Sequence, residues 1–283
     1  MIWILLSVLS ASSLFIVFKQ FDRYGVDRFT AVLFNYLFAG ATGLMLFDLQ
    51  VRQALDCQNC LFFTFSLGFI FVTLFNLLAF VTSKNGASTS VLANKMAFVL
   101  PVFLSVFVFG ESLNWQLILA LLIGLIGLYL AVKPAVEQKH KNSLFWPFVL
   151  FIGSGVLDFL LKIGERYVLS DWSSSMLTVA IFSSAFIWGL FYGVIKKKII
   201  FTKKNILWAA ILGIPNFFSI YFLFKALSAF SEQSVILFPI NNVGIILCTT
   251  LLAVAVFREK LSKLNLMGLF FCVLSIAILA YNA

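Results

Sequence analysis

The chain has 283 residues, of which 62% are apolar and only 11% are charged, and its formal net charge is +9. Soluble domains carry roughly 25% charged residues, so a soluble fold of this composition would have too little polar surface. The positive charge does not indicate a nucleic-acid partner, because the basic residues lie mainly in loops between apolar runs, where lysine and arginine orient membrane proteins.

Ten apolar runs follow one another, each close to the ~20 residues that a helix needs to cross a bilayer. They cover residues 2–19, 29–48, 61–82, 88–109, 115–132, 144–164, 173–195, 206–229, 234–257 and 264–281. Membrane β-strands would be about 10 residues long and alternate in polarity. We therefore predict an all-α integral membrane protein with ten transmembrane helices. The first run lacks a basic segment before it and a cleavage site, so we interpret it as a retained span.

Two pairs of similar strings indicate an internal duplication. Lys19-Gln-Phe-Asp-Arg-Tyr at 19–24 resembles Lys162-Ile-Gly-Glu-Arg-Tyr at 162–167, and Phe-Gly-Glu-Ser-Leu at 109–113 resembles Phe-Arg-Glu-Lys-Leu at 257–261. We predict a first five-helix repeat at 1–133, a linker loop at 134–143 and a second repeat at 144–283. With an odd number of spans per copy, the second copy inserts upside down, which gives inverted repeats.

The distribution of basic residues predicts the orientation of the chain. Most lysines and arginines follow odd-numbered spans, and few follow even-numbered ones. Because cytoplasmic loops carry the excess of positive charge, we predict that both termini lie outside the cytoplasm. We expect the cytoplasmic, or inner, membrane as the location.

Histidine and cysteine give little support for a metal centre. His140 is the single histidine of the sequence and lies in a loop, and the pair Cys57-x-x-Cys60 supplies two of the four ligands that a structural zinc site wants. On the predicted topology this pair faces outward, where a disulfide could persist, although two free thiols without a role are equally compatible. Cys248 and Cys272 lie within spans and are interpreted as packing residues. We expect neither a metal nor a cofactor.

The arrangement of ten spans as five plus five resembles the drug/metabolite transporter superfamily, specifically its EamA-like members. The local match is the end of the fourth and ninth spans, where Gly110-Glu111 and Arg258-Glu259 are each followed by a leucine and a glycine-bearing span. The resemblance implies a ten-helix bundle with a central substrate cavity and transport of small metabolites, amino acids, sugars or drugs. The chain departs from many relatives, which are assigned cytoplasmic termini.

Lys95 is the most informative side chain, because a lysine within a span costs ~2.5–3.5 kcal/mol on insertion scales. It either binds the anionic group of a substrate or extends to the nearer interface. Glu111 and Glu259 occupy the same place in two of the similar strings and lie 148 residues apart, and at this offset Asn94 corresponds to Asn242. Asn94, Asn241 and Asn242 are therefore candidates for cavity-lining groups or for hydrogen bonds between helices. Further polar candidates for substrate binding within apolar runs are Asn35, Asn76, Asn216 and Tyr221.

Asp158 lies one helical turn before Lys162, which predicts either an internal ion pair or a carboxylate that couples transport to a cation or proton.

The two duplicated strings contain Lys19, Asp22, Arg23, Glu165 and Arg166, which we interpret as helix ends with an aromatic anchor or as gates. Prolines interrupt backbone hydrogen bonding within spans, and Pro215 marks the bend that we expect to expose carbonyls. Gly189-x-x-x-Gly193 permits an internal helix crossing or a dimer face, so a monomer and a homodimer both stay open.

These features predict a secondary transporter, and not an enzyme, for a small polar metabolite with an anionic or zwitterionic group. Its partners would be this small molecule and membrane lipid. The alternatives are a flippase for lipids or lipid-linked sugars and a membrane enzyme, for which no cluster of His, Asp or Ser at an interface is visible in the sequence. The sequence contains no Gly-x-x-x-x-Gly-Lys motif, which argues against direct use of ATP.

Overall fold

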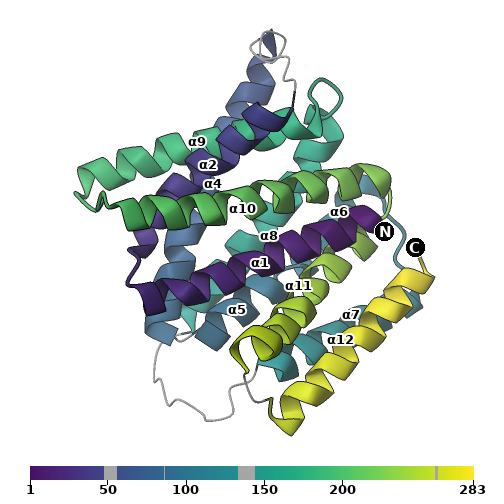
Figure 1. Cartoon of the computed structure of the whole chain (residues 1–283). Coiled ribbons are helices and arrows are strands. Elements are labelled where there is room, and N and C mark those ends of the chain that lie inside the picture. Colours follow the sequence, from purple (N-terminus) through teal and green to yellow (C-terminus); the bar gives the residue numbers. More distant parts are fainter. Residues whose placement is uncertain (48–55, 86, 133–143, 259–260) are drawn as a thin grey trace. The chain divides into compact units, whose positions relative to one another are not determined.

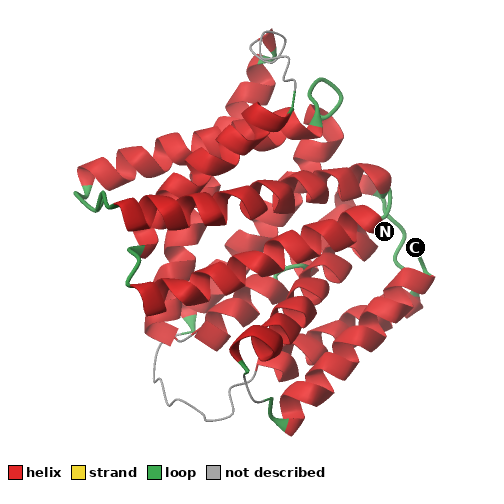
Figure 2. Ribbon diagram, in the orientation of Figure 1, coloured by secondary structure: helices red, strands yellow, loops and turns green. Residues whose placement is uncertain are grey.

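The computed structural model describes residues 1–47, 56–85, 87–132, 144–258 and 261–283. Within these ranges every regular element is a helix (Figure 2). Ten helical stretches are long and apolar enough to cross a membrane: Ile2–Phe21, Arg28–Leu46, Gln58–Thr82, Thr89–Phe109, Trp115–Val132, Phe145–Val168, Ser174–Ile195, Lys203–Ala229, Ser234–Phe257 and Lys263–Tyr281. They match the ten predicted spans, and the prediction of an all-α multi-pass membrane protein is confirmed.

The helices pack into two compact units, which are described separately. One comprises Met1–Thr73 and Ile163–Ser228, and the other comprises Leu74–Lys162 and Ala229–Ala283. Each unit therefore takes helices from both predicted halves of the chain. The divisions fall inside α4 (Gln58–Asn85) and α8 (Phe145–Val168) and at the last residue of α10 (Lys203–Ala229). This division describes packing, and the predicted inverted duplication with its linker at 134–143, which lies outside the described residues, stays a prediction.

The first unit is formed around α2 and α9, which lie side by side (Figure 1). Its helices are α1 (Ile2–Tyr24), α2 (Arg28–Leu46), the beginning of α4 (Gln58–Asn85), the end of α8 (Phe145–Val168), α9 (Ser174–Ile195) and α10 (Lys203–Ala229). A buried cluster of Leu33, Phe34 and Ala209 joins α2 to α10. Asp27 begins α2, because its carboxylate accepts a hydrogen bond from the Thr30 amide at 2.8 Å.

Two glycines of α9 allow this close packing. A Cβ atom at Gly189 would lie 2.9 Å from Leu33 Cδ1, and one at Gly193 would lie 2.9 Å from Phe29 Cε1. Small residues let helix backbones approach closely in a membrane. The Gly-x-x-x-Gly motif thus serves a helix crossing within the unit, while the predicted oligomeric state stays open.

The second unit contains α5 (Ala87–Met96), α6 (Val99–Phe109), α7 (Trp115–Val132), α11 (Ser234–Phe257) and α12 (Lys263–Tyr281), with the remainder of α4 and α8. Helices α7 and α12 lie side by side (Figure 1). Asn265 Nδ2 donates to the Ala131 carbonyl at 2.9 Å, and Ser275 Oγ donates to the Ala120 carbonyl at 2.7 Å. These bonds satisfy polar groups that lipid could not satisfy, including a carbonyl in the last turn of α7.

Large apolar side chains remain exposed on the helices. Phe62 is 76% exposed and Phe107 is 80% exposed. Such residues would promote aggregation in water, whereas the hydrocarbon core of a bilayer accommodates them without cost. The distribution of exposed side chains thus agrees with the assignment from helix length and hydropathy.

Candidate functional site

The fourth predicted span is interrupted, and the interruption lies next to Lys95. Helix α5 ends at Met96 and α6 begins at Val99, with a turn at Ala97 and Phe98. Pro101 has no N–H group with which to reach the Ala97 carbonyl, and its ring would clash with that carbonyl in a continuous helix. Instead, the Leu100 amide donates to the Ala97 carbonyl at 3.0 Å, which closes a tighter turn.

This break is not where the sequence suggested it. The expected bend at Pro215 lies inside α10, which is continuous from Lys203 to Ala229, and Pro239 likewise lies inside the continuous α11. A proline removes one hydrogen bond in either case, and packing decides whether the helix also changes direction. Only in the fourth span does the described backbone leave the helix beside a charged residue.

The break brings three polar side chains from three helices together. Lys95 Nζ of α5 donates to Asn242 Oδ1 of α11 at 3.3 Å, and Asn242 Nδ2 donates to Asp158 Oδ2 of α8 at 3.4 Å. The opposite charges of Lys95 and Asp158 also attract each other. We call these three residues the charge triad. Asn242 is 4% exposed, and Lys95 and Asp158 are half-buried.

The position of Lys95 in the last turn of α5 favours its charge, because the C-terminal end of a helix carries a partial negative charge. The neighbouring Asn94 Nδ2 donates to Ser154 Oγ of α8 at 2.9 Å. Ser154 and Asp158 are four residues apart and lie on one face of α8. Consecutive residues of α5 therefore both engage that face, Asn94 directly and Lys95 through Asn242.

Gly155 permits the close approach of α8 to the break. A Cβ atom at this position would lie 2.6 Å from Leu100 Cβ and 2.8 Å from the Ala97 carbonyl oxygen. These atoms belong to the backbone or are attached directly to it, so they cannot rotate away. The absence of a side chain at Gly155 thus sets the distance between α8, which carries Asp158, and the end of α5.

We expect Gly155→Ala to reduce transport while all charged groups remain. The added methyl group would push α8 away from the break and separate Asp158 from Lys95 and Asn242. Small misplacements of binding groups can cost up to ~100-fold, and we expect a loss of about 10- to 100-fold. Uptake into proteoliposomes measures the change.

Gly153→Ala is the matched control on the same helix, because its Cβ would meet chiefly the Leu74 Cδ2 methyl, at 2.4 Å. That methyl is the end of a flexible side chain and can move. Equal transport by the two variants would contradict the role assigned to Gly155.

A second buried polar cluster holds the beginning of α11. Glu111 accepts a hydrogen bond from the Val235 amide at 2.9 Å and another from Ser234 Oγ, which also contacts Ser105 Oγ at 2.9 Å. A carboxylate at a helix N-terminus satisfies free amides and complements the helix dipole. Gly110, with a left-handed φ of 67°, ends α6 and directs the chain toward this contact. Glu111 therefore anchors the helix that carries Asn242.

Lys162 is fully buried, and its ammonium donates to the Ser231 carbonyl in the turn before α11. Its Nζ also lies 5.9 Å from the centre of the Phe109 ring. The described partners of Asp158 are Asn242 and the charge of Lys95. The predicted coupling between Asp158 and Lys162 stays a prediction.

The remaining candidates for substrate binding divide between the two units. In the first unit, Asn216 Nδ2 donates to Asn35 Oδ1 at 3.0 Å, and the ring of Tyr221 stacks on that of Phe217. Asn76 of α4 and Asn241 of α11 belong to the second unit. The structure thus brings Asn35 and Asn216 together as one pair, and its second unit holds the charge triad.

The two duplicated strings differ in their surroundings. In the first, the Arg23 guanidinium lies 5.8 Å from the Tyr24 ring centre, and that ring packs 5.1 Å from the ring of Trp208. In the second, Lys162 and Glu165 are buried. The side chain of Asp22 lies outside the described residues. The exposed members are Lys19, Arg23, Tyr24, Arg166 and Tyr167. Their role as gates or anchors stays a prediction.

Three contributions to the site were not predicted from the sequence. The expectations from sequence do not include Ser154 or Gly155, and they connect Glu111 with a family motif but not with a contact. A signal was present for the first two, since Ser154, Gly155 and Asp158 recur at helical spacing in one apolar run. For Glu111 no local signal exists, because its partners Ser234 and Val235 are distant in sequence.

Comparison with known proteins shows which family the first part of the chain resembles. The model of the EamA-like transporter family matches residues 1–133. Residues 1–133, slightly less than half of the chain, are thus similar to the EamA-like transporter family. EamA-like proteins are membrane transporters of the drug/metabolite type, as the sequence predicted.

Two further similarities extend the comparison to the whole chain. An uncharacterized protein of Haemophilus influenzae is 25% identical over 287 residues, which cover 98% of this chain and 97% of that relative. A solved structure, titled only as the crystal structure of a protein, matches with a TM-score of 0.79 at 14% identity and covers 100% of this chain and 96% of that one. The structural match shows that the whole chain shares its fold with that solved structure.

Proposed function

We propose that this EamA-like protein is a secondary transporter that moves a small zwitterionic, amino-acid-like metabolite across the cytoplasmic membrane by alternating access. The observation that carries the proposal is the charge triad. Lys95 and Asp158 place a positive and a negative charge on either side of the Asn242 amide, within membrane spans and beside a helix break. Such breaks line substrate sites in secondary transporters.

The triad offers one partner to each end of a zwitterion. The Lys95 ammonium would bind the substrate carboxylate, and the Asp158 carboxylate would bind the substrate ammonium. Asn242 has an amide oxygen and an amide N–H₂ group, so it can hydrogen-bond to either end. A ligand with one charge would satisfy one of these residues and leave the other without its partner, which is costly in a membrane.

Exchange of partners also explains why the empty site is tolerated. Without substrate, Lys95 and Asp158 neutralise each other through Asn242. When a zwitterion enters, Lys95 pairs with the substrate carboxylate and Asp158 pairs with the substrate ammonium, and these pairs replace the interaction between Lys95 and Asp158. The net charge of the site is therefore unchanged throughout the cycle, and no uncompensated charge is exposed to the bilayer.

The proposal also includes the orientation of the chain in the membrane and the movement that gives alternating access. The excess of lysine and arginine after odd-numbered spans supports cytoplasmic odd-numbered loops and external termini. The duplicated strings support inverted repeats, whose rocking about a fixed site would provide alternating access.

The decisive experiment compares solutes that differ only in charge. Purified protein in proteoliposomes is loaded with unlabelled amino acids, and exchange is measured for labelled amino acids, their decarboxylated amines and their deaminated carboxylates. We expect saturable exchange of at least one zwitterion and exchange about 10-fold slower or less for its single-charge analogues, since one buried partner then stays unpaired. A thermal-shift screen with the same solutes reports binding independently.

Other outcomes would reject the proposal in recognisable ways. Preferred exchange of the carboxylate would remove Asp158 from substrate recognition. Flux without saturation would indicate a channel. Lipid movement between leaflets in the absence of solute exchange would support the flippase alternative.

A further inference from the structure

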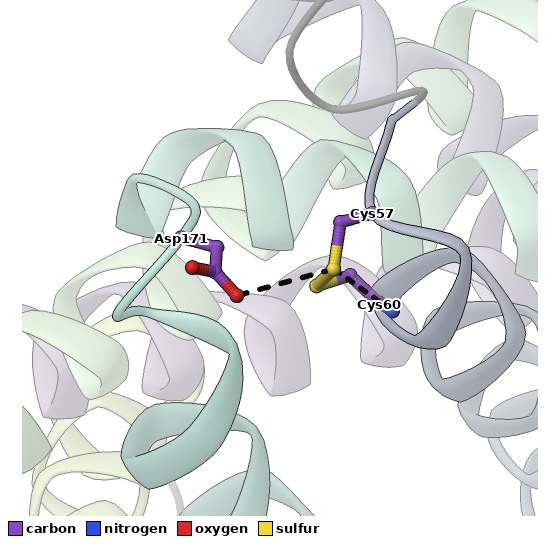
Figure 3. A group of neighbouring side chains, drawn as sticks. All are labelled: Cys57, Cys60 and Asp171. Carbon is purple, nitrogen blue, oxygen red and sulfur yellow. Dashed lines mark hydrogen bonds between the residues drawn. A yellow bond between two sulfur atoms is a disulfide. The ribbon is translucent and has the colours of Figure 1, made fainter.

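A cluster of side chains of the types that can ligate metals lies in the first unit and takes no part in the proposed transport site. Cys57 directly precedes α4, Cys60 lies in its first turn, and Asp171 belongs to the turn between α8 and α9 (Figure 3). The two sulfur atoms and a carboxylate oxygen all lie within 4.8 Å of one another. Cys57 and Cys60 are joined by a disulfide, and the Cys57 sulfur lies 4.0 Å from Asp171 Oδ2.

Asp171 adds a carboxylate to the two cysteines, so the group contains three side chains that can ligate a metal. The sequence showed two cysteines, which are too few for a zinc site, and folding adds the Asp171 carboxylate from a distant segment. If the disulfide is reduced and both thiols ionise, three negative charges meet in one place. Like charges at this distance repel each other, and a bound cation removes that repulsion.

The types of donor select the cation. Thiolates bind borderline-soft ions such as Zn²⁺, whereas Mg²⁺ and Ca²⁺ prefer oxygen ligands. Two sulfurs and one carboxylate would supply three of the four positions of a tetrahedral site and leave the fourth for water. The Cys60 amide points at the Cys57 sulfur at 3.4 Å, and such a bond helps to hold a thiolate at the N-terminus of a helix.

Exposure of the cluster allows an ion and a reductant to reach it. Asp171 is exposed and Cys57 is half-buried, while Cys60 is 3% exposed. An external thiol would therefore meet the Cys57 sulfur first. The remaining cysteines, Cys248 and Cys272, lie in α11 and α12 of the other unit and contribute no atom to this group.

We propose that Cys57, Cys60 and Asp171 form a redox-gated binding site for a divalent cation of the Zn²⁺ class. A disulfide reductant, which is a dithiol outside the cytoplasm or a phosphine in vitro, supplies two electrons that break the sulfur–sulfur bond, and both sulfurs become thiols. A dithiol also supplies the two protons and becomes a disulfide. With a phosphine, one water molecule supplies the two protons and the oxygen atom of the phosphine oxide. Cation binding then displaces both thiol protons to solvent. The oxidised pair lacks thiolates and does not bind.

Cobalt is the spectroscopic probe for this site. The full chain in detergent is reduced with a phosphine and titrated with Co²⁺, which gives sulfur-to-metal charge-transfer absorption when thiolates bind and ligand-field bands that report tetrahedral geometry. We expect one Co²⁺ per chain, displacement of Co²⁺ by Zn²⁺, and no such absorption in the oxidised protein.

Variants separate the cluster from the other thiols and acids. Cys57→Ser should remove most of the charge-transfer absorption, and Asp171→Asn should weaken Co²⁺ binding by about 10-fold or more, the range in which even outer-shell changes act. Asp56→Asn is the matched control, because Asp56 is exposed beside Cys57 and is not a member of the group. Helix content by circular dichroism and a single elution peak confirm that each variant is folded.

Two results would overturn the proposal. The first is reduced protein that shows no thiolate–cobalt absorption, or the same absorption in Cys57→Ser. The second is equal affinity in Asp171→Asn and Asp56→Asn, which would remove the carboxylate from the site. Asp171 is on the surface, so its variant tests the proposal even if Cys57→Ser fails to fold.

Discussion

Replacement of Lys95 by alanine is expected to abolish transport while the protein remains folded in the membrane. The substitution removes the cation that the substrate carboxylate would bind and leaves Asp158 and Asn242 without their partner. Truncation of one member of a hydrogen-bonded charge pair costs about 2–5 kcal/mol, which corresponds to a loss of affinity of roughly 30-fold or more.

Proteoliposome exchange of the zwitterion identified by the solute comparison measures this effect. Lys95→Arg keeps the charge and should retain part of the activity, whereas Lys196→Ala removes an exposed lysine after α9 and should leave exchange unchanged. The double variant Lys95→Ala/Asp158→Asn has no unpaired charge, so it distinguishes lost binding from lost folding. Unchanged exchange by Lys95→Ala would refute the role of this residue.

Gly268→Ala is expected to cause the largest loss of stability among single methyl additions. A Cβ atom at this position of α12 would lie 2.2 Å from the Ala131 amide nitrogen and 2.7 Å from Ala131 Cα in α7. Both are backbone atoms, so the two helices must separate. Separation would also lengthen the hydrogen bonds from Asn265 to the Leu130 and Ala131 carbonyls. Overpacking of this kind costs about 1–3 kcal/mol, and lost hydrogen bonds add to that cost.

Thermal unfolding in detergent, followed by tryptophan fluorescence, measures this change as a lowered midpoint. Gly40→Ala in α2 is the control, since its Cβ would lie 3.4 Å from Ser183 Oγ, which is ordinary contact. Its midpoint should stay the same or rise slightly, because alanine favours a helix over glycine by about 1 kcal/mol. Equal midpoints for Gly268→Ala and the unmodified protein would show that α7 and α12 do not pack this closely.

The transmembrane helices could be predicted because their signal is local. A run of about twenty apolar residues crosses a bilayer whatever surrounds it, and the predicted spans match the observed helices closely. The interruption before Pro101 could not be placed in the same way. Pro101, Pro215 and Pro239 carry the same local signal, but among them only Pro101 follows a break in its helix, where the Ala97 turn packs against Gly155.

The candidate site, too, could be predicted from the sequence only in part. Lys95 was identified from sequence because a charge within an apolar run is costly wherever its partner lies. Its connection to Asp158 through Asn242 joins α5, α8 and α11, which are far apart in the chain. The sequence relates Asp158 to Lys162, its neighbour on the same helix, because sequence spacing reports only such neighbours.

Composition and periodicity by themselves determined that this protein spans a membrane, how many helices cross it, and which lysine requires an explanation. Those properties depend on the transfer of each segment from water to lipid, which adds up residue by residue along the chain. Tertiary structure alone decided which groups neutralise Lys95, that Glu111 anchors α11, and that Asp171 approaches Cys57 and Cys60. These contacts join distant segments, and they form because small residues and helix breaks let particular backbones approach, which no local pattern records.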